Sequence, residues 1–170
     1  MSFKAENISI LVDYAHEPEG MKLLMNTLDE YRSKGKIDSI IHIYSATGSG
    51  RDAWKRPEMS LSSGNTADVI FITAEDHDAK DNLEEINTEL EAQVRQGSRV
   101  QNVIIENDRK TAFQKALEYV RQNLADKKVA IVSTAMGSQQ GMETAAGVIK
   151  WDERQVWSEV WQSFLSQSIN

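Results

Sequence analysis

The sequence has 170 residues, of which 40% are hydrophobic and 26% charged, a balance that excludes a disordered tail and predicts a globular protein. The length predicts one domain covering residues 1–170. The formal net charge of −7 argues against a nucleic-acid partner. No apolar run approaches the about 18 residues that a membrane span needs, so we expect no membrane partner. The first seven residues carry no secretory signal, and cysteine is absent, so we expect a cytoplasmic protein without disulfides.

Short apolar, β-branched runs alternate with amphipathic segments along the chain. Strands are predicted at 8–12, 37–44, 69–72, 100–105 and 129–132, and a hairpin at 142–144 and 147–149. Helices are predicted at 18–35, 83–97, 111–124 and 151–165, with a short one starting at Pro57. This alternation predicts an α/β fold, a Rossmann-like, mostly parallel sheet of about five to six strands with helices on both faces. Ligands bind such sheets at the carboxyl ends of the strands, so the residues after each strand are the candidate site.

The first strand is followed by an acid, a phenol and an imidazole, Asp13, Tyr14 and His16. An acid can hold a ribose hydroxyl or a metal-bound water, and a histidine can donate to a phosphate or stack beneath a base. The alternative is a polar turn in which Glu17 complements the dipole of the following helix.

The second strand is followed by a loop with three positive charges, Arg51, Lys55 and Arg56, in an acidic chain. Such a cluster suits a phosphate or a carboxylate, which predicts an anion site. The loop is not a Walker A motif, and its alternative interpretation is a solvated loop.

Acidic residues and a histidine follow the third strand: Glu75, Asp76, His77, Asp78 and Asp81. The composition resembles that of a metal site, but acids at the start of a helix commonly cap it, and the capping interpretation is preferred. The segment 133–141 after the fifth strand is polar and contains no nucleophile elbow. The sequence therefore predicts no metal site and no catalytic residue.

The motifs in order resemble the C-terminal domain of the Mur ligases, above all of the branch that adds the third amino acid to UDP-MurNAc-L-Ala-D-Glu. The segment Val12–Pro18 is similar to the family's Val-Asp-Tyr-Ala-His-x-Pro, and Gly50–Pro57 to its Gly-Asp-Arg-Asp-Lys-x-Lys-Arg-Pro loop. Four further blocks follow in the family's order, at 67–73, 108–113, 136–139 and 151–154.

The resemblance implies a Rossmann-like lid that closes over ATP and brings the incoming amino acid in a bacterial ligase of peptidoglycan synthesis. It implies that ATP and Mg²⁺ act only in a complete ligase, whose P-loop and UDP-substrate domains a separate partner chain would supply. The small-molecule partners would be a nucleotide and an amino acid. The implied nucleotide side holds Asp13, Tyr14 and His16. The implied amino-acid or anion site holds Arg51, Lys55, Arg56, Asp76, Asp78 and Gln139.

The chain departs from the family at two motifs. Asp-Asn-Pro-Arg becomes Glu75–Asp78, and the Lys, His and Glu of Gly-Lys-Gly-His-Glu become Met136, Ser138 and Gln139. Asp78 would repel a ligand carboxylate and attract an ammonium. Two alternatives therefore stay open beside the ligase part: a non-catalytic module that binds a ligand or a protein, and a self-contained Rossmann-type enzyme.

Overall fold

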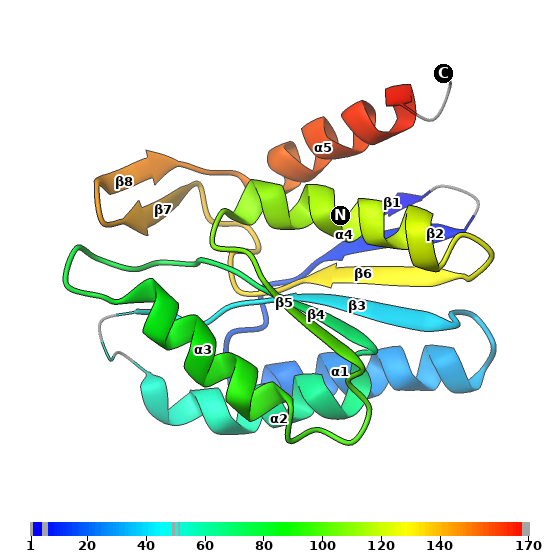
Figure 1. Cartoon of the computed structure of the whole chain (residues 1–170), viewed down its shortest axis with the longest axis horizontal. Helices are drawn as coiled ribbons and strands as arrows, with labels where there is room; N and C mark the ends of the chain where they lie inside the picture. Colours follow the sequence, from blue (N-terminus) through cyan, green and yellow to red (C-terminus); the bar gives the residue numbers. More distant parts are fainter. Residues whose placement is uncertain (1, 5–6, 49, 51, 168–170) are drawn as a thin grey trace.

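The computed structural model describes residues 2–4, 7–48, 50 and 52–167 (Figure 1). The strands are β1 (Ser2–Lys4), β2 (Ile8–Val12), β3 (Ser39–Tyr44), β4 (Val69–Ile72), β5 (Asn102–Ile105), β6 (Val129–Ser133), β7 (Gly141–Thr144) and β8 (Gly147–Lys150). The helices are α1 (Pro18–Ser33), α2 (Arg56–Thr66), α3 (Leu83–Val94), α4 (Arg109–Asn123) and α5 (Glu153–Gln167), with a 3₁₀ turn η1 (Ala53–Lys55) before α2.

Six strands form one sheet in the order β1-β2-β6-β3-β4-β5, and β7 and β8 form a separate antiparallel hairpin. Strands β2, β6, β3, β4 and β5 are parallel, whereas β1 pairs antiparallel with β2. Strand β6 lies between β2 and β3, with Ile131 opposite Ile10 on one side and Ile41 on the other. The predicted α/β class and the mostly parallel sheet are confirmed.

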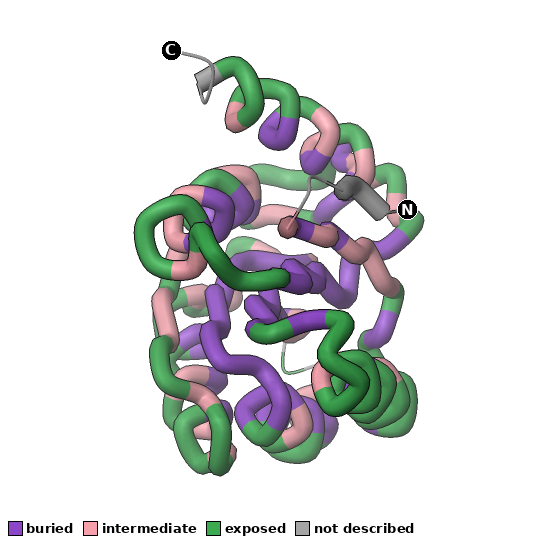
Figure 2. Tube along the Cα trace, turned by 90° about the vertical axis from the view of Figure 1, so that its right-hand side faces the viewer, coloured by how far each residue is buried: buried purple, intermediate pink, exposed green. Residues whose placement is uncertain are grey.

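Helices cover both faces of the sheet. In Figure 1, α4 and α5 lie above it and α1, α2 and α3 below it. Each face has its own core, because neighbouring strand residues point to opposite faces. Phe113 of α4 stacks on Trp157 of α5 with ring centroids 4.1 Å apart in the upper core, and Met21 and Leu90 are buried in the lower core. Figure 2 shows the buried trace concentrated in the strands, while the outer faces of the helices are exposed. Trp151, Trp157 and Trp161 are all buried in the upper core.

Two glycines allow α2 to approach the end of α3. A Cβ added to Gly97 would lie 2.1 Å from the carbonyl carbon of Gly64, and one added to Gly64 would lie 2.1 Å from the carbonyl oxygen of Val94. The backbone of Val100 also donates a hydrogen bond to the carbonyl of Gly64 at 3.0 Å. No side chain fits between these backbones, so the contact requires glycine at both positions.

Several element bounds differ from those predicted. Strand β3 begins at Ser39, where the amides of Asp38 and Ser39 both donate to the carbonyl of Lys128, the residue before β6. Helix α4 begins earlier than predicted, at Arg109, where the Asp108 side chain caps the amide of Thr111 at 2.7 Å. Strand β1 was not predicted, because only three residues form it and no apolar run marks them. Among the described residues, no helix has the length and apolar character needed to cross a membrane.

Candidate functional site

The loops that follow β2, β3, β4 and β6 meet at one edge of the sheet, near the β7–β8 hairpin (Figure 1). Backbone hydrogen bonds hold them together. The amide of Asp13 donates to the carbonyl of Ser133 at 2.9 Å, and the amide of Gly48 donates to the carbonyl of Asp76 at 2.8 Å. Parallel strands bring their carboxyl ends to one edge, so residues far apart in the sequence form one site.

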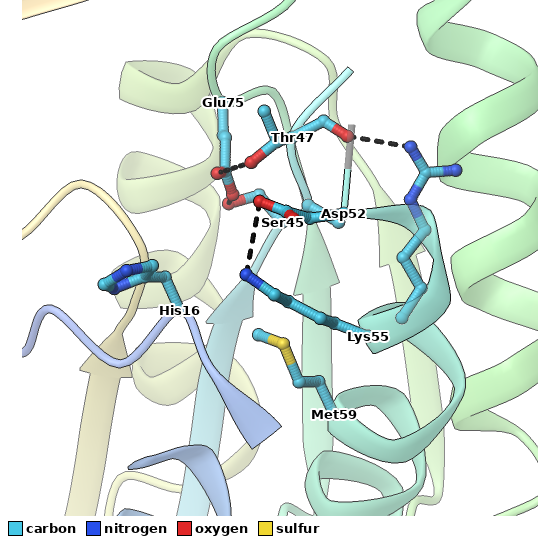
Figure 3. A pocket seen from close by; sticks show the side chains of 9 residues that line it. His16, Ser45, Thr47, Asp52, Lys55, Met59 and Glu75 are labelled. Atoms are coloured by element: carbon cyan, nitrogen blue, oxygen red, sulfur yellow. Dashed lines mark hydrogen bonds and ion pairs between the residues drawn. The ribbon is translucent and has the colours of Figure 1, made fainter. Parts of the chain in front are cut away.

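A small cavity of about 30 Å³ lies among these loops (Figure 3). Its lining residues come from all of the first three loops and the start of α2: His16, Ser45, Ala46, Thr47, Asp52, Lys55, Arg56, Met59 and Glu75. A water molecule needs roughly 10–15 Å³ of such space, so a cavity of about 30 Å³ has room for only two or three waters. Small-molecule pockets have volumes of about 300–1,000 Å³, so this cavity is too small to enclose an amino acid.

Lys55 is nearly buried at this cavity, and its ammonium is already paired within the chain. Its Nζ donates to Glu17 at 2.5 Å and lies 3.2 Å from Asp52. The hydrogen bond to Glu17 is the main cause that raises the pKa of Lys55. Asp52 has a φ of 58°, a left-handed backbone conformation that is uncommon outside glycine and turns the loop back toward Lys55. The lysine therefore carries a full positive charge, balanced by two carboxylates.

Arg56 is the second buried base of the same loop. Its Nη1 donates to Glu89 of α3 at 2.8 Å, and its Nη2 donates to the carbonyl of Thr47 at 2.7 Å. Its Nε is buried and has no hydrogen-bond partner among the residues that the structure describes. Both described bases thus lie at the predicted anion site, and each is neutralised by an acid of the chain. Arg51 lies outside the described residues.

Glu75 is a buried carboxylate on the wall of the cavity. It accepts hydrogen bonds from the hydroxyls of Ser45 at 2.9 Å and Thr47 at 2.7 Å. Burial raises the pKa of Glu75, because removal from water disfavours the charged form, and the two hydroxyls oppose this shift. The two hydrogen bonds fix the position of the Glu75 side chain, and Figure 3 shows it beside Thr47.

The residues expected on the nucleotide side form an exposed aromatic pair. The rings of Tyr14 and His16 lie with their centroids 4.5 Å apart, and His16 Nδ1 is hydrogen-bonded to the carbonyl of Tyr14. Asp13 accepts from the amide of Ala15 at 2.8 Å and so fixes the turn. Gly137 leaves room for Tyr14, since an added Cβ would lie 2.5 Å from the tyrosine side chain. Tyr14 and His16 are both about half exposed, at 47% for Tyr14 and 46% for the side chain of His16.

Asp76 and Gln139, both predicted in the amino-acid site, bind each other. Gln139 Nε2 donates to Asp76 Oδ2 at 3.2 Å, and the amide of Glu143 in β7 donates to Asp76 Oδ1 at 2.8 Å. Asp76 therefore joins the β4 loop to the β7–β8 hairpin. Asp78 accepts from the amide of Lys80 at 2.6 Å within the β4 loop. Within the described part of the chain, no three acidic or histidine side chains gather closely enough to hold a metal ion.

Sequence reasoning missed a buried ion pair behind the site, between Arg109 and Glu153. Their side chains are fully buried, with Nη2 and Oε1 2.8 Å apart. Arg109 also donates to Ser45 Oγ and to the carbonyls of Ala74 and Thr134, which lie at the ends of β3, β4 and β6. One guanidinium thus sets the spacing of three strand-end loops. The Asp-Arg block at 108–109 was a sequence signal for this position, but it did not identify Glu153 as the partner.

His42 was also missed. It lies in the middle of β3, fully buried, with Nδ1 2.7 Å from Ser63 Oγ and Nε2 2.9 Å from Thr134 Oγ1. Burial lowers the pKa of His42 to about 3, with a smaller contribution from the positive charge of Arg109. His42 is fully buried and both of its ring nitrogens are hydrogen-bonded within the protein, so it supports the strands beneath the site.

Comparisons with known proteins identify the family of the chain. The family model described as "Mur ligase, glutamate ligase domain" matches residues 1–146. A UDP-N-acetylmuramoyl-L-alanyl-D-glutamate–2,6-diaminopimelate ligase of Clostridium botulinum is 31% identical over 151 residues, covering 89% of this chain and 28% of that protein. A UDP-N-acetylmuramyl-tripeptide synthetase of Treponema denticola is 25% identical over 152 residues, covering 88% of this chain and 27% of that protein.

Solved structures show the same fold. A UDP-N-acetylmuramoyl-L-alanyl-D-glutamate–2,6-diaminopimelate ligase matches with a TM-score of 0.75 and 17% identity, over 96% of this chain and 31% of that one. The folylpolyglutamate synthase of Mycobacterium tuberculosis matches with a TM-score of 0.58 and 16% identity, over 79% of this chain and 28% of that one. The chain therefore spans less than a third of the length of these proteins. With the family model covering most of its length, it belongs to the Mur ligase family, as a glutamate ligase domain homologous to ligases of peptidoglycan synthesis.

Proposed function

We propose that this chain is the amino-acid-positioning lid of an ATP-dependent ligase that joins an amino acid to a UDP-linked peptide. The single observation that carries the proposal is the cavity at the strand ends. Two buried bases, Lys55 and Arg56, line it, yet its volume of about 30 Å³ is far below that of a substrate pocket. A binding surface with charged residues but without an enclosing wall is what a lid supplies to a site completed by another domain.

The P-loop and UDP-substrate domains would come from outside this chain, and we propose a separate chain as their source. The described residues fit one part of a nucleotide, because the Tyr14–His16 ring pair offers a face on which a base can stack. ATP and Mg²⁺ would supply phosphoryl activation of the acceptor carboxylate in the completed site. This chain's own residues would hold the incoming amino acid in register and exclude water when the lid closes.

The amino acid would lie along the basic loop and the β4 loop. Its carboxylate would approach Arg51 and the neighbouring bases, and its side chain would approach Asp78. An acid at that position favours a side chain that ends in an ammonium over one that ends in a second carboxylate. This charge preference separates the chain from the diaminopimelate ligases among its relatives.

Reconstitution in trans tests the proposal. The Clostridium botulinum relative, truncated before the region that matches this chain, would be mixed with the purified chain, its UDP-linked substrate and Mg-ATP. We expect ADP release that depends on this chain and on an added amino acid, and that is greater with lysine or ornithine than with diaminopimelate. The Arg51→Ala and His16→Ala variants should lower this rate. No chain-dependent ADP release at any amino-acid concentration would contradict the proposal.

A second candidate is a non-catalytic binding module derived from the same domain. It is favoured by the hydrogen bond between Gln139 and Asp76, because these two side chains satisfy each other in place of a ligand. Titration calorimetry of the chain alone with Mg-ADP and the amino-acid panel distinguishes the two. Binding without any reconstituted turnover is the result expected for the module.

A further inference from the structure

Glu17 occupies the cap position of α1 but does not cap the helix. Its backbone is extended and its side chain accepts no hydrogen bond from the first-turn amides. The carboxylate instead reaches Lys55, 38 positions away, at 2.5 Å. The sequence suggested that Glu17 interacts with the helix dipole, but in the structure it forms an ion pair between two loops of the site.

This contact joins the loop that carries Tyr14 and His16 to the basic loop. Figure 3 shows Lys55 extending from the start of α2 along the cavity, with His16 on one side and Asp52 on the other. The Lys55 side chain is 10% exposed, whereas that of Glu17 is 49% exposed. Lys55 is therefore largely buried, whereas Glu17 lies at the protein surface.

We infer that Glu17 is an internal competitor for the oxyanion that Lys55 would bind, so that ligand entry requires the Glu17–Lys55 ion pair to open. The inference rests on the proposed function, in which Lys55 binds a carboxylate or phosphate group of a ligand. Of the two acids on Lys55, Glu17 is the one that leaves. It is half exposed and its side chain rotates into water, while Asp52 is fixed on the same turn as Lys55 at i−3. An oxyanion that replaces Glu17 preserves the charge balance of Lys55.

Lysine labelling detects this pair without any ligand. The wild-type chain, Glu17→Gln and the control Glu19→Gln would be treated with an acetylating N-hydroxysuccinimide ester, and the rate at each lysine followed by mass spectrometry. Glu19 is exposed in the same helical turn, so both variants remove one carboxylate from the start of α1. We expect Lys55 to react more slowly than the exposed Lys22 in the wild type and in Glu19→Gln. In Glu17→Gln we expect Lys55 to react several-fold faster than in the wild type.

The same labelling in the presence of acetate or inorganic phosphate tests the competition and separates the two oxyanion sources. Ion pairs at the solvent boundary contribute about a 1.4- to 5-fold change in an equilibrium constant, so half-protection of Lys55 should need about 1.4- to 5-fold less oxyanion in Glu17→Gln. Protection by acetate alone would identify a carboxylate site, and protection by phosphate a phosphate site.

Two results would overturn the inference, and they differ in what they say about the proposed function. Equal labelling rates of Lys55 and Lys22 in the wild type, or an unchanged rate at Lys55 in Glu17→Gln, would mean that the ion pair does not limit access to Lys55. That result would leave the proposed function, tested by reconstituted turnover, unaffected. Fast labelling in Glu17→Gln without protection by either oxyanion means that Lys55 binds none, which also removes its role in the proposed function.

Discussion

Arg109 and Glu153 are 44 positions apart in the sequence, and each is the principal ionic partner of the other in the interior of the protein. Trp151 adds a hydrogen bond from its Nε1 to Glu153 at 2.8 Å, so the carboxylate is bonded from two sides. The pair connects the start of α4 to the start of α5, directly behind the strand-end loops.

The variant Glu153→Ala should be strongly destabilised. It leaves the Arg109 guanidinium buried with its charge uncompensated, which costs about 3–5 kcal/mol in comparable buried pairs. Urea unfolding followed by circular dichroism measures the change in the free energy of unfolding. The double variant Arg109→Met/Glu153→Ala serves as the control and should recover part of the loss. A loss below about 1 kcal/mol in the single variant would contradict the assigned role of the pair.

Acid should destabilise the protein through His42. Its pKa in the folded protein is about 3, below the 6.5 of the unfolded chain, so only the unfolded state takes up a proton between these values. The stabilising contribution of neutral His42 is therefore complete above pH 6.5 and is lost as the pH falls toward 3. One such group changes the free energy of unfolding by about 1.4 kcal/mol per pH unit.

The variant His42→Gln lacks this titration, and its amide can still bond Ser63 and Thr134. The difference in the free energy of unfolding between the wild type and His42→Gln should therefore shrink from pH 7 to pH 5. A difference that stays constant over this range would show that the buried imidazole does not cause the acid sensitivity.

Glu75 should act in the opposite direction. Its pKa is raised by burial, so the folded state holds its proton to higher pH than the unfolded chain does. The contribution of Glu75 to stability is present below the unfolded value of 4.5 and is lost as the pH rises through the raised folded value. Relative to the wild type, Glu75→Gln should gain stability between pH 4.5 and pH 7.5, as measured by denaturant unfolding at both values. A relative loss over this interval would mean that the carboxylate is stabilised as an anion.

The two glycine positions make a matched pair of substitutions. Gly97→Ala drives a methyl group into the backbone of Gly64 and should cost about 1–3 kcal/mol, the usual penalty of overpacking. Gly20→Ala, on α1, meets no atom within 4 Å and should stabilise the protein by about 0.5–1 kcal/mol, because alanine is the better helix former. Thermal unfolding of both variants checks the opposite signs. Equal effects would contradict the close backbone contact between Gly64 of α2 and Gly97, which follows α3.

The fold was largely readable from local patterns, and the side-chain pairing of the site was not. Continuous apolar runs such as Val69–Ile72 predicted the parallel strands. Whether a basic side chain of the site can bind a ligand depends on its tertiary contacts with acidic side chains of the chain. Lys55 meets Glu17 across 38 positions, and Gln139 meets Asp76 across 63. Spacing along the chain carries no signal for such pairs, because they form only when the loops converge.

The strand order also determines when the sheet can form during synthesis. Strand β6 lies between β2 and β3 and pairs with both of them. Strands β2 and β3 therefore cannot be joined into one sheet until residues 129–133 have been synthesised. A nascent chain that ends before β6 exposes one open edge on β2 and another on β3, and unpaired edges are the usual starting point of aggregation. Closure of the sheet is therefore a late event that depends on contacts distant in sequence, which makes folding slow compared with that of a helical bundle. Ribosome-bound fragments of this domain would depend on chaperone protection until β6 emerges.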